Sequence, residues 1–260
     1  MPSDAEIRNY WDRKAEQLGT DPSATMKDVI LRTLEIESIS ARLHSEDTLL
    51  DIGCGNAFGS VRFAAHCNSV LAVDYSDQMI RMASDAIQAG GLRNIRATQG
   101  DVLTIGDFHE RQFTATSSVR CLINLPSEEQ QYTAIAQLAK TLVRGGRLFL
   151  LEAFAPNFAA MNAMRQRVGL PAIVQDWHNR FFETKNFQTE VERWFRIEEI
   201  VDFGEYYFLS RIVHPLLVAP EEPSFQGKAN HVASDIWRSH ILGGRLADIS
   251  TLLLYVCRKL

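Results

Sequence analysis

The sequence predicts an α/β protein whose core is a doubly wound sheet of seven strands, with helical segments added to it. Between residues 48 and 155, short apolar runs rich in β-formers alternate with amphipathic stretches of helical length. Strands separated by such helices require right-handed crossovers and therefore a parallel sheet. A glycine turn at Gly53 and Gly55 follows the first apolar run, as expected where a strand passes into a helix.

The elements follow in order along the chain. The predicted strands are residues 49–52, 69–73, 95–98, 113–119 and 147–151, with two late ones at 197–203 and 251–258. A helix continues through 61–66 after the glycine turn. Ser76 is a suitable N-cap for a second helix that ends at Gly90 and Gly91, and a third is expected over about 127–143. The turn at Gly145 and Gly146 leads into the fifth strand.

Three regions lie outside this alternation, so we divide the chain into four parts. Residues 1–44 are predicted to form a helical lid, broken near 19–22 and continued by a helix from Met26 to about Leu43. Residues 45–155 form the core and 156–196 a helical, aromatic-rich cap. Residues 197–260 supply the last strands, with an insertion at about 204–249. We expect these additions to cover the carboxyl edge of the sheet, where open α/β folds bind ligands.

Composition excludes several classes of function. The 260 residues carry a formal net charge of −5, which argues against a nucleic-acid-binding face. No apolar run reaches the length of a membrane span, and the first residues lack a secretory-signal pattern. The four cysteines (Cys54, Cys67, Cys121, Cys257) are scattered, which indicates reduced thiols in a cytoplasmic protein, and no metal-ligand spacing is present. The expected partner is a small molecule; the oligomeric state is not indicated.

Acidic residues follow the second and third predicted strands. Asp74 lies 19 residues after Gly55, close to the spacing at which an acid accepts both hydroxyls of a ribose. This arrangement serves dinucleotides and adenosylmethionine alike. Asp101, followed by Val102, adds an acid able to accept from an adenine amino group, with a backbone N–H for a ring nitrogen. Together with the helix start after the glycine turn, these residues indicate a nucleotide-like cofactor.

Four linked motifs make the chain resemble the class I S-adenosylmethionine-dependent methyltransferases, which have a Rossmann-like fold. They are Leu-Asp-Ile-Gly-Cys-Gly-Asn (50–56), Val-Asp-Tyr-Ser-Asp-Gln-Met-Ile (73–80), Gly-Asp-Val-Leu (100–103) and the glycine pair before Leu148. Their order and spacing fit over about residues 48–155. Ala57 stands where many relatives have a third glycine, and Thr114 replaces a frequent acid.

The resemblance implies a role for each matching residue in binding S-adenosyl-L-methionine and its product S-adenosyl-L-homocysteine. Asp51 would lie near the glycine turn and the ammonium group, and Asp74 would bind the ribose. Tyr75 and Met79 would pack beside the adenine, which Asp101 and Val102 select, while Arg120 would line the cofactor. The implied cofactor-binding set is Asp51, Gly53, Cys54, Gly55, Asn56, Asp74, Tyr75, Met79, Asp101, Val102 and Arg120.

A looser resemblance points to a subgroup of bacterial small-molecule methyltransferases. It rests on the run from Arg120 to Ser127, on 34–36, and on Asn162, Arg165 and His178-Asn179 in the cap. His178 is the candidate general base, because histidine titrates near neutrality; the alternative is a structural histidine. Arg165 and Arg211 are able to hold a carboxylate or phosphate, or to stabilise the cap. The candidate substrate residues are Tyr10, Trp11, Glu152, Asn162, Arg165, Asn179, Tyr206, Tyr207 and Arg211.

The sequence therefore predicts a methyltransferase that acts on an oxygen or nitrogen of a small molecule by in-line displacement. Such a reaction depends mainly on alignment of the two substrates, so the absence of a catalytic dyad is uninformative. One alternative is a nicotinamide-dependent oxidoreductase, which the spacing of Gly53, Gly55 and Gly59 disfavours because it is not GxGxxG. A second is a non-catalytic module that senses the cofactor. The acceptor, and the choice between oxygen and nitrogen, stay open.

Overall fold

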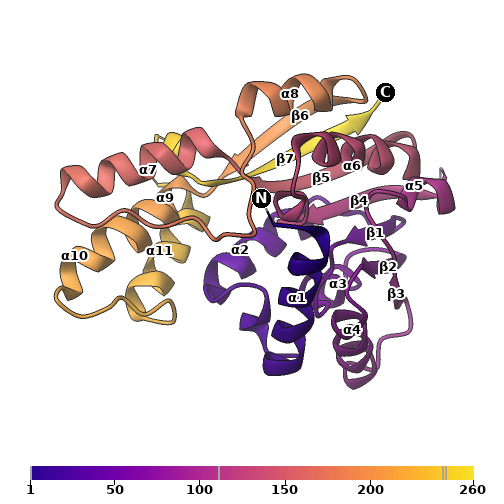
Figure 1. The fold of residues 1–260 in the computed structure, drawn as a ribbon, viewed down its shortest axis with the longest axis horizontal. Helices are drawn as coiled ribbons and strands as arrows, with labels where there is room; N and C mark the ends of the chain where they lie inside the picture. Colours follow the sequence, from indigo (N-terminus) through magenta and orange to yellow (C-terminus); the bar gives the residue numbers. More distant parts are fainter. Residues whose placement is uncertain (1, 111, 242, 244) are drawn as a thin grey trace.

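The computed structural model describes residues 2–110, 112–241, 243 and 245–260, and its centre is one seven-stranded sheet (Figure 1). The strand order is β3-β2-β1-β4-β5-β7-β6. The strands are β1 (Thr48–Ile52), β2 (Ser69–Asp74), β3 (Ile95–Gln99), β4 (Phe113–Val119), β5 (Leu142–Ala153), β6 (Phe195–Asp202) and β7 (Leu252–Lys259). Each predicted strand is thus present, and the order reverses between β1 and β4, the usual place for a ligand site.

The sheet is mixed rather than wholly parallel. Strands β1 to β5 pair in parallel, as predicted, but β7 runs antiparallel to both β5 and β6. The reason is the path of the chain after β6. The segment from 203 to 251 leaves and rejoins the sheet at the same edge, so the next strand has to run back in the opposite direction. A hydrogen bond of 2.7 Å from the Phe203 N–H to Ser250 Oγ closes the base of this segment.

Helices between the strands bury the faces of the sheet. They are α3 (Phe58–Phe63), α4 (Asp77–Ala89), α5 (Ile105–Phe108), α6 (Glu128–Thr141) and α8 (Thr184–Glu192), with a short turn of helix at η2 (Leu122–Asn124). Figure 1 shows α6 and α8 above the sheet and α3 and α4 below it. The central strands β1 and β5 carry apolar, buried runs, Leu49–Leu50 and Leu148–Leu151, as parallel strands covered on both faces require.

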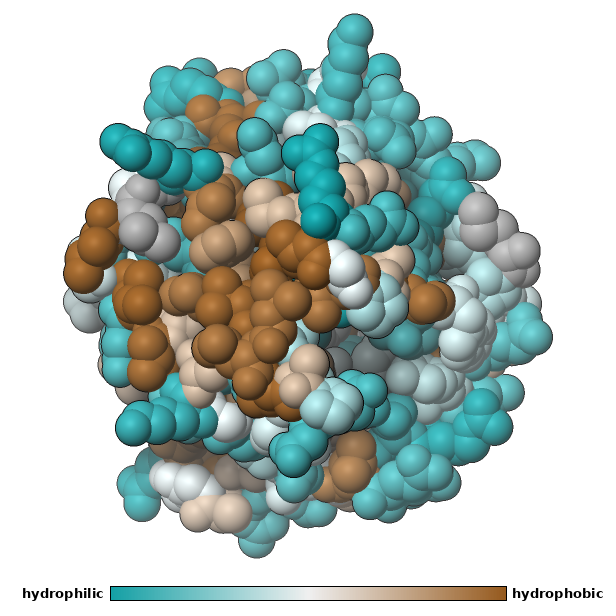
Figure 2. Space-filling model, turned by 90° about the vertical axis from the view of Figure 1, so that its left-hand side faces the viewer, coloured by the Kyte–Doolittle hydropathy of each residue, from teal (hydrophilic) through white to brown (hydrophobic). Residues whose placement is uncertain are grey.

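The remaining helices gather at the carboxyl ends of the parallel strands (Figure 1). The amino-terminal part forms α1 (Asp4–Leu18), η1 (Pro22–Ala24) and α2 (Val29–Ser40). The excursion after β6 forms α9 (Gly204–Phe208), η3 (Leu209–Val213, a π-helix), α10 (His214–Val218), α11 (Lys228–Ser239) and η4 (Ala247–Ile249). Exposed apolar side chains such as Val174, Leu216 and Leu217 belong to this cap, and Figure 2 shows apolar surface gathered on its side of the molecule.

Two predicted helical stretches are shorter than expected. The second amino-terminal helix begins at Val29 rather than Met26, because the Asp28 side chain caps it by accepting the Leu31 N–H. The cap predicted over 156–196 contains α7 (Ala155–Arg167) and α8, but the chain between them is irregular. Gly169, with a φ of +80°, and Pro171 end the first of these helices. This irregular segment comprises residues 168–183.

The glycine turn after β1 is constrained on two sides. Gly53 and Gly55 have φ values of +72° and +56°, in the left-handed region that glycine adopts without strain. A Cβ on Gly53 would lie 2.5 Å from Cys121 Sγ, so the loop after β4 packs directly against this turn. Ala57 also has a positive φ, of +61°, and ends the turn without a third glycine.

The contact between Gly53 and Cys121 predicts a difference between two glycine substitutions. Gly53→Ala should destabilise the protein for two reasons, the left-handed φ and a steric clash of the new Cβ. Gly145→Ala should destabilise it only through its φ of +75°, because a Cβ at this position has no atom within 4 Å. We expect Gly145→Ala to lower the free energy of unfolding by about 1–2 kcal/mol, and Gly53→Ala to lower it by at least twice as much. Urea unfolding of both variants measures the difference. Equal losses would show that the turn does not pack against Cys121.

Candidate functional site

A cavity of about 700 Å³ opens at the carboxyl ends of β1, β2 and β4. Its floor is made by the glycine turn and by the residues that end β2 and β4. Its walls come from α1, the start of α2, the irregular segment 168–183 and η3. Segments from both ends of the chain therefore meet over the edge of the sheet at which the strand order reverses.

The structure brings most of the predicted site residues to this cavity. Those that line it are Tyr10, Trp11, Asp51, Gly53, Cys54, Gly55, Asp74, Tyr75, Met79, Arg120, His178, Asn179, Tyr207 and Arg211. Seven others do not line it: Asn56, Asp101, Val102, Glu152, Asn162, Arg165 and Tyr206. The first group includes both carboxylates predicted to contact the methionine and ribose parts of a cofactor.

Asp74 ties the end of β2 to the glycine turn. One carboxylate oxygen accepts the Gly55 N–H at 2.9 Å, and the other accepts the Ser76 N–H at the same distance. Burial raises the pKa of Asp74 to about 6, although both backbone hydrogen bonds favour the charged form. The aspartate is therefore held in one orientation on the cavity floor, ionised at neutral pH, with acceptor capacity left for a ligand.

Asp51 is the second acid of the floor. Its two oxygens accept hydrogen bonds from Ser60 Oγ at 2.5 Å and Ser117 Oγ at 2.7 Å. Burial raises its pKa to about 6, against the effect of these two hydroxyls and of the nearby positive charge of Arg32. A carboxylate in this state is a suitable counter-charge for a cationic group of a ligand.

The helix α1 covers the cavity as a lid. Asp12 accepts a short hydrogen bond from Ser76 Oγ at the start of α4, and Arg8 lies 5.1 Å from the ring centre of Tyr75. Trp11 Nε1 donates to Asn124 Oδ1 at 3.3 Å. These contacts fasten the lid to the loops after β2 and β4, so the lid and the cavity floor share their supports.

His178 is enclosed by the aromatic rings of the lid and of its own loop. Its ring centre lies 4.4 Å from that of Tyr10, 5.5 Å from that of Trp11 and 5.4 Å from that of Trp177. Burial lowers its pKa below the ordinary value of 6.5, so the ring is neutral at pH 7. Its Nδ1 atom is buried and has no hydrogen-bond partner among the described residues. A neutral ring with an unpaired nitrogen at the cavity wall is able to accept a proton.

A buried charged cluster, which the sequence did not predict as part of the site, lies beside the cavity. Arg32 of α2 donates to the Pro22 carbonyl and, at 3.3 Å, to Asn56 Oδ1. Burial, reinforced by the positive charge of Arg120, lowers the pKa of Arg32 to about 9. Glu35 is fully buried one turn later, with Oε2 3.3 Å from Arg120 Nε, and burial raises its pKa.

Arg120 ends β4 in an unusual conformation. Its φ is +52°, which costs a residue with a side chain of the order of 1–2 kcal/mol. Its carbonyl accepts from Asn124 Nδ2 at 2.7 Å, and its N–H donates to the Leu151 carbonyl at 2.7 Å. This backbone geometry directs the guanidinium group to the cavity, and strain of this kind is typical of functional positions.

Several predicted substrate residues instead build the cavity wall. Asn162 exchanges hydrogen bonds with the backbone of Ile173, at 3.0 and 2.8 Å. Arg165 donates to the carbonyls of Pro171 and Arg211. Since all their partners are backbone groups, these two side chains hold the irregular segment 168–183 and η3 in place. Neither side chain lines the cavity, so contact of Asn162 and Arg165 with a substrate stays a prediction.

Glu152 is also structural rather than part of the wall. It is fully buried, and its carboxyl oxygens accept the N–H groups of Leu122 at 2.9 Å and Ile123 at 3.2 Å. It thereby fixes η2, which carries the segment after Arg120. Burial raises its pKa to about 8, outweighing these hydrogen bonds.

The remaining predicted site residues that do not line the cavity are held elsewhere in the structure. Asn56 donates to the carbonyls of Gly19 and Asp21 and so fastens the end of the lid. Tyr206 donates to Asp28 at 2.8 Å, behind the cavity wall. Asp101 Oδ1 accepts the Leu103 N–H at 2.9 Å, and Val102 is buried. Roles for Asp101 and Val102 in binding adenine stay predictions.

Unpaired buried polar atoms mark the cavity as a ligand site. Among the described residues, Tyr75 Oη and His178 Nδ1 are such atoms, both on residues that line the cavity, whereas Arg120 Nε and Glu35 Oε2 form no hydrogen bond but face each other as an ion pair at 3.3 Å. Buried polar atoms in folded proteins nearly always have a partner. The two acids, the glycine turn and these unpaired atoms therefore suit a polar, partly cationic ligand with hydroxyl groups.

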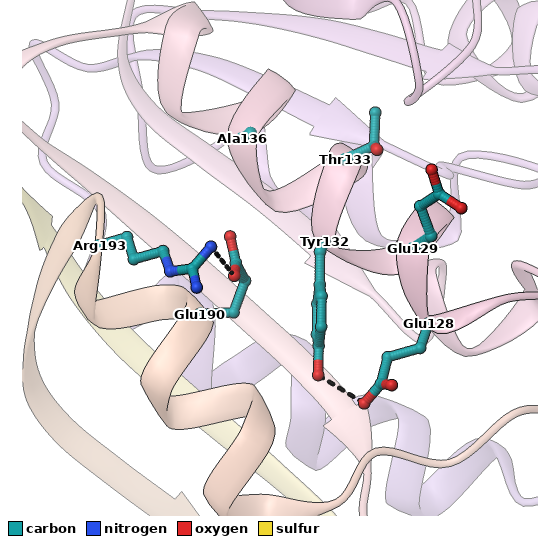
Figure 3. A pocket seen from close by; sticks show the side chains of 7 residues that line it. All are labelled: Glu128, Glu129, Tyr132, Thr133, Ala136, Glu190 and Arg193. Atoms are coloured by element: carbon teal, nitrogen blue, oxygen red, sulfur yellow. Dashed lines mark hydrogen bonds and ion pairs between the residues drawn. The ribbon is translucent and has the colours of Figure 1, made fainter.

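A second hollow, of about 470 Å³, lies on the outer surface between α6 and α8 (Figure 3). Its polar side chains are occupied with one another: Tyr132 donates to Glu128 at 2.6 Å, and Arg193 pairs with Glu190 at 2.9 Å. None of the predicted site residues lines it. Within the described ranges, no cluster of His, Cys, Asp and Glu is arranged to hold a metal ion, and no helix is both long and apolar enough to cross a membrane.

Comparison with known proteins identifies the core. A family model described as a methyltransferase domain matches residues 49–146. The chain is 22% identical over 163 residues to the uncharacterized methyltransferase YcgJ of Bacillus subtilis (strain 168), covering 60% of this chain and 63% of that protein. It is 28% identical over 162 residues to the 27-O-demethylrifamycin SV methyltransferase of Amycolatopsis mediterranei (strain S699), covering 61% and 55%. The matches thus span less than two thirds of these relatives.

A solved structure shares the fold over nearly the whole chain. The N-methyltransferase NodS from Bradyrhizobium japonicum WM9, determined in complex with S-adenosyl-L-homocysteine, superposes with a TM-score of 0.60. The alignment covers 97% of this chain and 98% of that one at 16% identity. The likeness includes the cap segments as well as the sheet.

The burial of Glu152 predicts a pH-dependent stability that one substitution removes. Because its pKa in the folded protein is about 8 and that of the unfolded chain is near 4.5, the folded state holds an extra proton between these values. The contribution of this carboxyl to the free energy of unfolding is fully present below pH 4.5 and is lost as the pH rises through 8. From pH 6.5 to 8.5 the wild-type protein should lose about 1–2 kcal/mol more than Glu152→Gln.

Urea unfolding at both pH values measures this difference. Asp51 and Asp74, whose pKa values are about 6, titrate mainly below pH 6.5, and what remains of their titration contributes equally to both proteins. Identical pH dependence of the two proteins would contradict the raised pKa of Glu152.

Proposed function

Because the chain belongs to the class I S-adenosylmethionine-dependent methyltransferases, we propose that it transfers a methyl group to an oxygen or nitrogen of a small molecule. The observation that carries this proposal is the cavity at the carboxyl ends of β1, β2 and β4, with Asp51 and Asp74 on its floor. The relative that acts on demethylrifamycin SV supports a small-molecule acceptor. The net charge of −5 favours such an acceptor over a nucleic acid and is compatible with a cytoplasmic protein.

The floor of the cavity suits the two ends of the cofactor. Asp74 would accept hydrogen bonds from the ribose hydroxyls, since each of its oxygens uses only one backbone N–H. Asp51 would face the ammonium group of the methionine part. Tyr75, Met79, Asp101 and Val102 would surround the adenine, and the unpaired Tyr75 hydroxyl supports a polar neighbour there.

Arg32 extends this assignment beyond the residues expected from the sequence. It is buried beside Asn56 and close enough to Asp51 for the two charges to influence each other. Its present hydrogen bonds go to neutral oxygens, so its charge has no carboxylate in direct contact. We propose that Arg32 binds the carboxylate of the methionine part, next to Asp51 at its ammonium group.

The bound cofactor supplies an activated methyl group on a sulfonium, so the protein mainly has to align the acceptor and exclude water. The lid α1 and the irregular segment 168–183 would perform the second task, because their aromatic side chains close the cavity around His178. His178, neutral at pH 7, would accept the proton that the acceptor loses. The lid contacts of Asp12 and Arg8 would couple closure to the loop after β2.

Calorimetric titration with S-adenosyl-L-homocysteine tests the cofactor site. Asp74→Asn should weaken binding about tenfold or more, because a charged acceptor of the ribose hydroxyls is lost. Asp77→Asn, an exposed change three residues later, is the matched control and should leave the affinity unchanged. Wild-type affinity should also fall as the pH drops below about 6, where Asp74 and Asp51 take up protons.

Absence of binding to the wild-type protein would refute the proposed function. Binding of the cofactor without methyl transfer to any member of a metabolite panel would instead indicate a non-catalytic binding protein. An equal affinity of the Asp74 and Asp77 variants would remove Asp74 from the site.

His178 can be examined without knowledge of the acceptor. In an NMR titration of the imidazole signals, His178 should titrate below pH 6.5, because burial among three aromatic rings disfavours its charged form. A value at or above 6.5 would contradict the lowered pKa of His178.

A further inference from the structure

Arg211 is held at the cavity by contacts on several sides. It lies on the π-helix η3 and lines the cavity, with a side chain only 12% exposed. Its guanidinium group donates to Asp28 Oδ2 at 2.6 Å. The central carbon of this group, Cζ, lies 4.8 Å from the ring centre of Phe225 and 5.5 Å from that of Tyr207. Contact with a carboxylate and with aromatic faces leaves the group few orientations.

A chain of hydrogen bonds supports Asp28 from behind. Tyr206 Oη donates to both carboxylate oxygens, at 2.8 and 3.0 Å, and accepts from Asn230 Nδ2 at 3.0 Å. Asn230 Oδ1 in turn lies 2.9 Å from His214 Nδ1. A buried ion pair adds little stability over an apolar replacement. A network that fixes such a pair at a cavity wall is better explained by the need to orient Arg211.

Arg120 places a second guanidinium group at the same cavity. Tyr207 lies close enough to Arg120 and Arg211 for both positive charges to act on its hydroxyl. The side chain of Arg120 is 16% exposed, its Nε has no hydrogen-bond partner among the described residues, and Glu35 at 3.3 Å is its counter-charge. Each group therefore keeps donors for a further partner, since a guanidinium has five N–H bonds.

The charge of the cavity has the opposite sign to that of the whole chain. Although the protein has a net charge of −5, the cavity is lined by Lys14, Lys27, Arg32, Arg120 and Arg211. Asp51, Asp74 and Arg32 are assigned to a cofactor that itself carries a net positive charge. The remaining cations face only Asp28 and Asp176 on the cavity wall, with Glu35 behind it. Arg120 and Arg211 are balanced by Glu35 and Asp28, so the excess positive charge comes from Lys14 and Lys27 at the rim of the cavity, and it favours a negative ligand.

We propose that the methyl acceptor carries a carboxylate or phosphate group, which Arg120 and Arg211 bind from two sides near Tyr207. This inference rests on the proposed function, because it assigns the acceptor part of the same cavity. The anion would complete the donors that Arg120 and Arg211 leave unused, in the charge-assisted geometry that guanidinium groups favour. Lys14 and Lys27 would attract such an acceptor to the mouth of the cavity.

The test is calorimetric titration of the protein saturated with S-adenosyl-L-homocysteine, so that the cofactor part of the cavity is filled. The probes are inorganic phosphate, 4-hydroxybenzoate and the uncharged 4-hydroxybenzamide. We expect saturable binding of at least one anion, and 4-hydroxybenzamide to bind more weakly than 4-hydroxybenzoate. Preference for phosphate or for 4-hydroxybenzoate identifies the kind of anion.

The variants are chosen to keep the fold. The double variant Glu35→Gln/Arg120→Asn places at position 120 a residue that accepts a positive φ, and it leaves no buried carboxylate without its counter-charge. The double variant Asp28→Asn/Arg211→Gln removes both charges of the buried pair, so that no carboxylate is left unpaired. Each should weaken anion binding about tenfold or more. Arg238→Gln, on the surface of α11, is the matched control and should bind as the wild type does.

The outcomes separate the two proposals. The inference is overturned if the Glu35/Arg120 and Asp28/Arg211 variants bind anions as tightly as the Arg238 control does. It is also overturned if 4-hydroxybenzoate and 4-hydroxybenzamide bind equally well. Failure of both anions to bind the saturated protein also overturns it. Failure of S-adenosyl-L-homocysteine itself to bind contradicts the proposed function instead.

Discussion

The two hydrogen bonds that Asp74 accepts from the Gly55 and Ser76 N–H groups hold the site together. They join the end of β2 to the turn after β1, and Ser76 in turn binds the lid through Asp12. Gly53 packs on the loop after β4 in the same turn. Three strand ends and the lid thus depend on one buried carboxylate, whose raised pKa reflects what its desolvation costs.

The sequence predicted the core well because its signals there are local. A glycine turn, an N-cap at Ser76 and acids at strand ends follow from neighbouring residues, and the strand order at β1 and β4 brings them to one edge. The direction of β7 was not predicted, because it depends on where a long excursion ends, which no short window records.

The buried polar and charged side chains around the cavity were less predictable, because their partners lie far away in the sequence. Arg32 and Asp28 resemble the solvated charges of an ordinary helix, and only their distant partners, Asn56 and Arg211, reveal them as buried. Asn162 and Arg165 were assigned to the substrate because their chemistry suits one, yet in the structure they donate to the backbone carbonyls of Ile173, Pro171 and Arg211. The competition between backbone and ligand for a polar side chain is decided by tertiary structure.

The excursion between β6 and β7 begins and ends at one point, where the Phe203 N–H meets Ser250 Oγ. A segment anchored in this way is a cassette: its length and contents can change without altering the register of any strand. It carries Arg211 and its supporting network, whereas Asp51 and Asp74 belong to the frame that receives it. Grafting a different cassette between these two anchor residues would therefore change the acceptor and leave the cofactor in place.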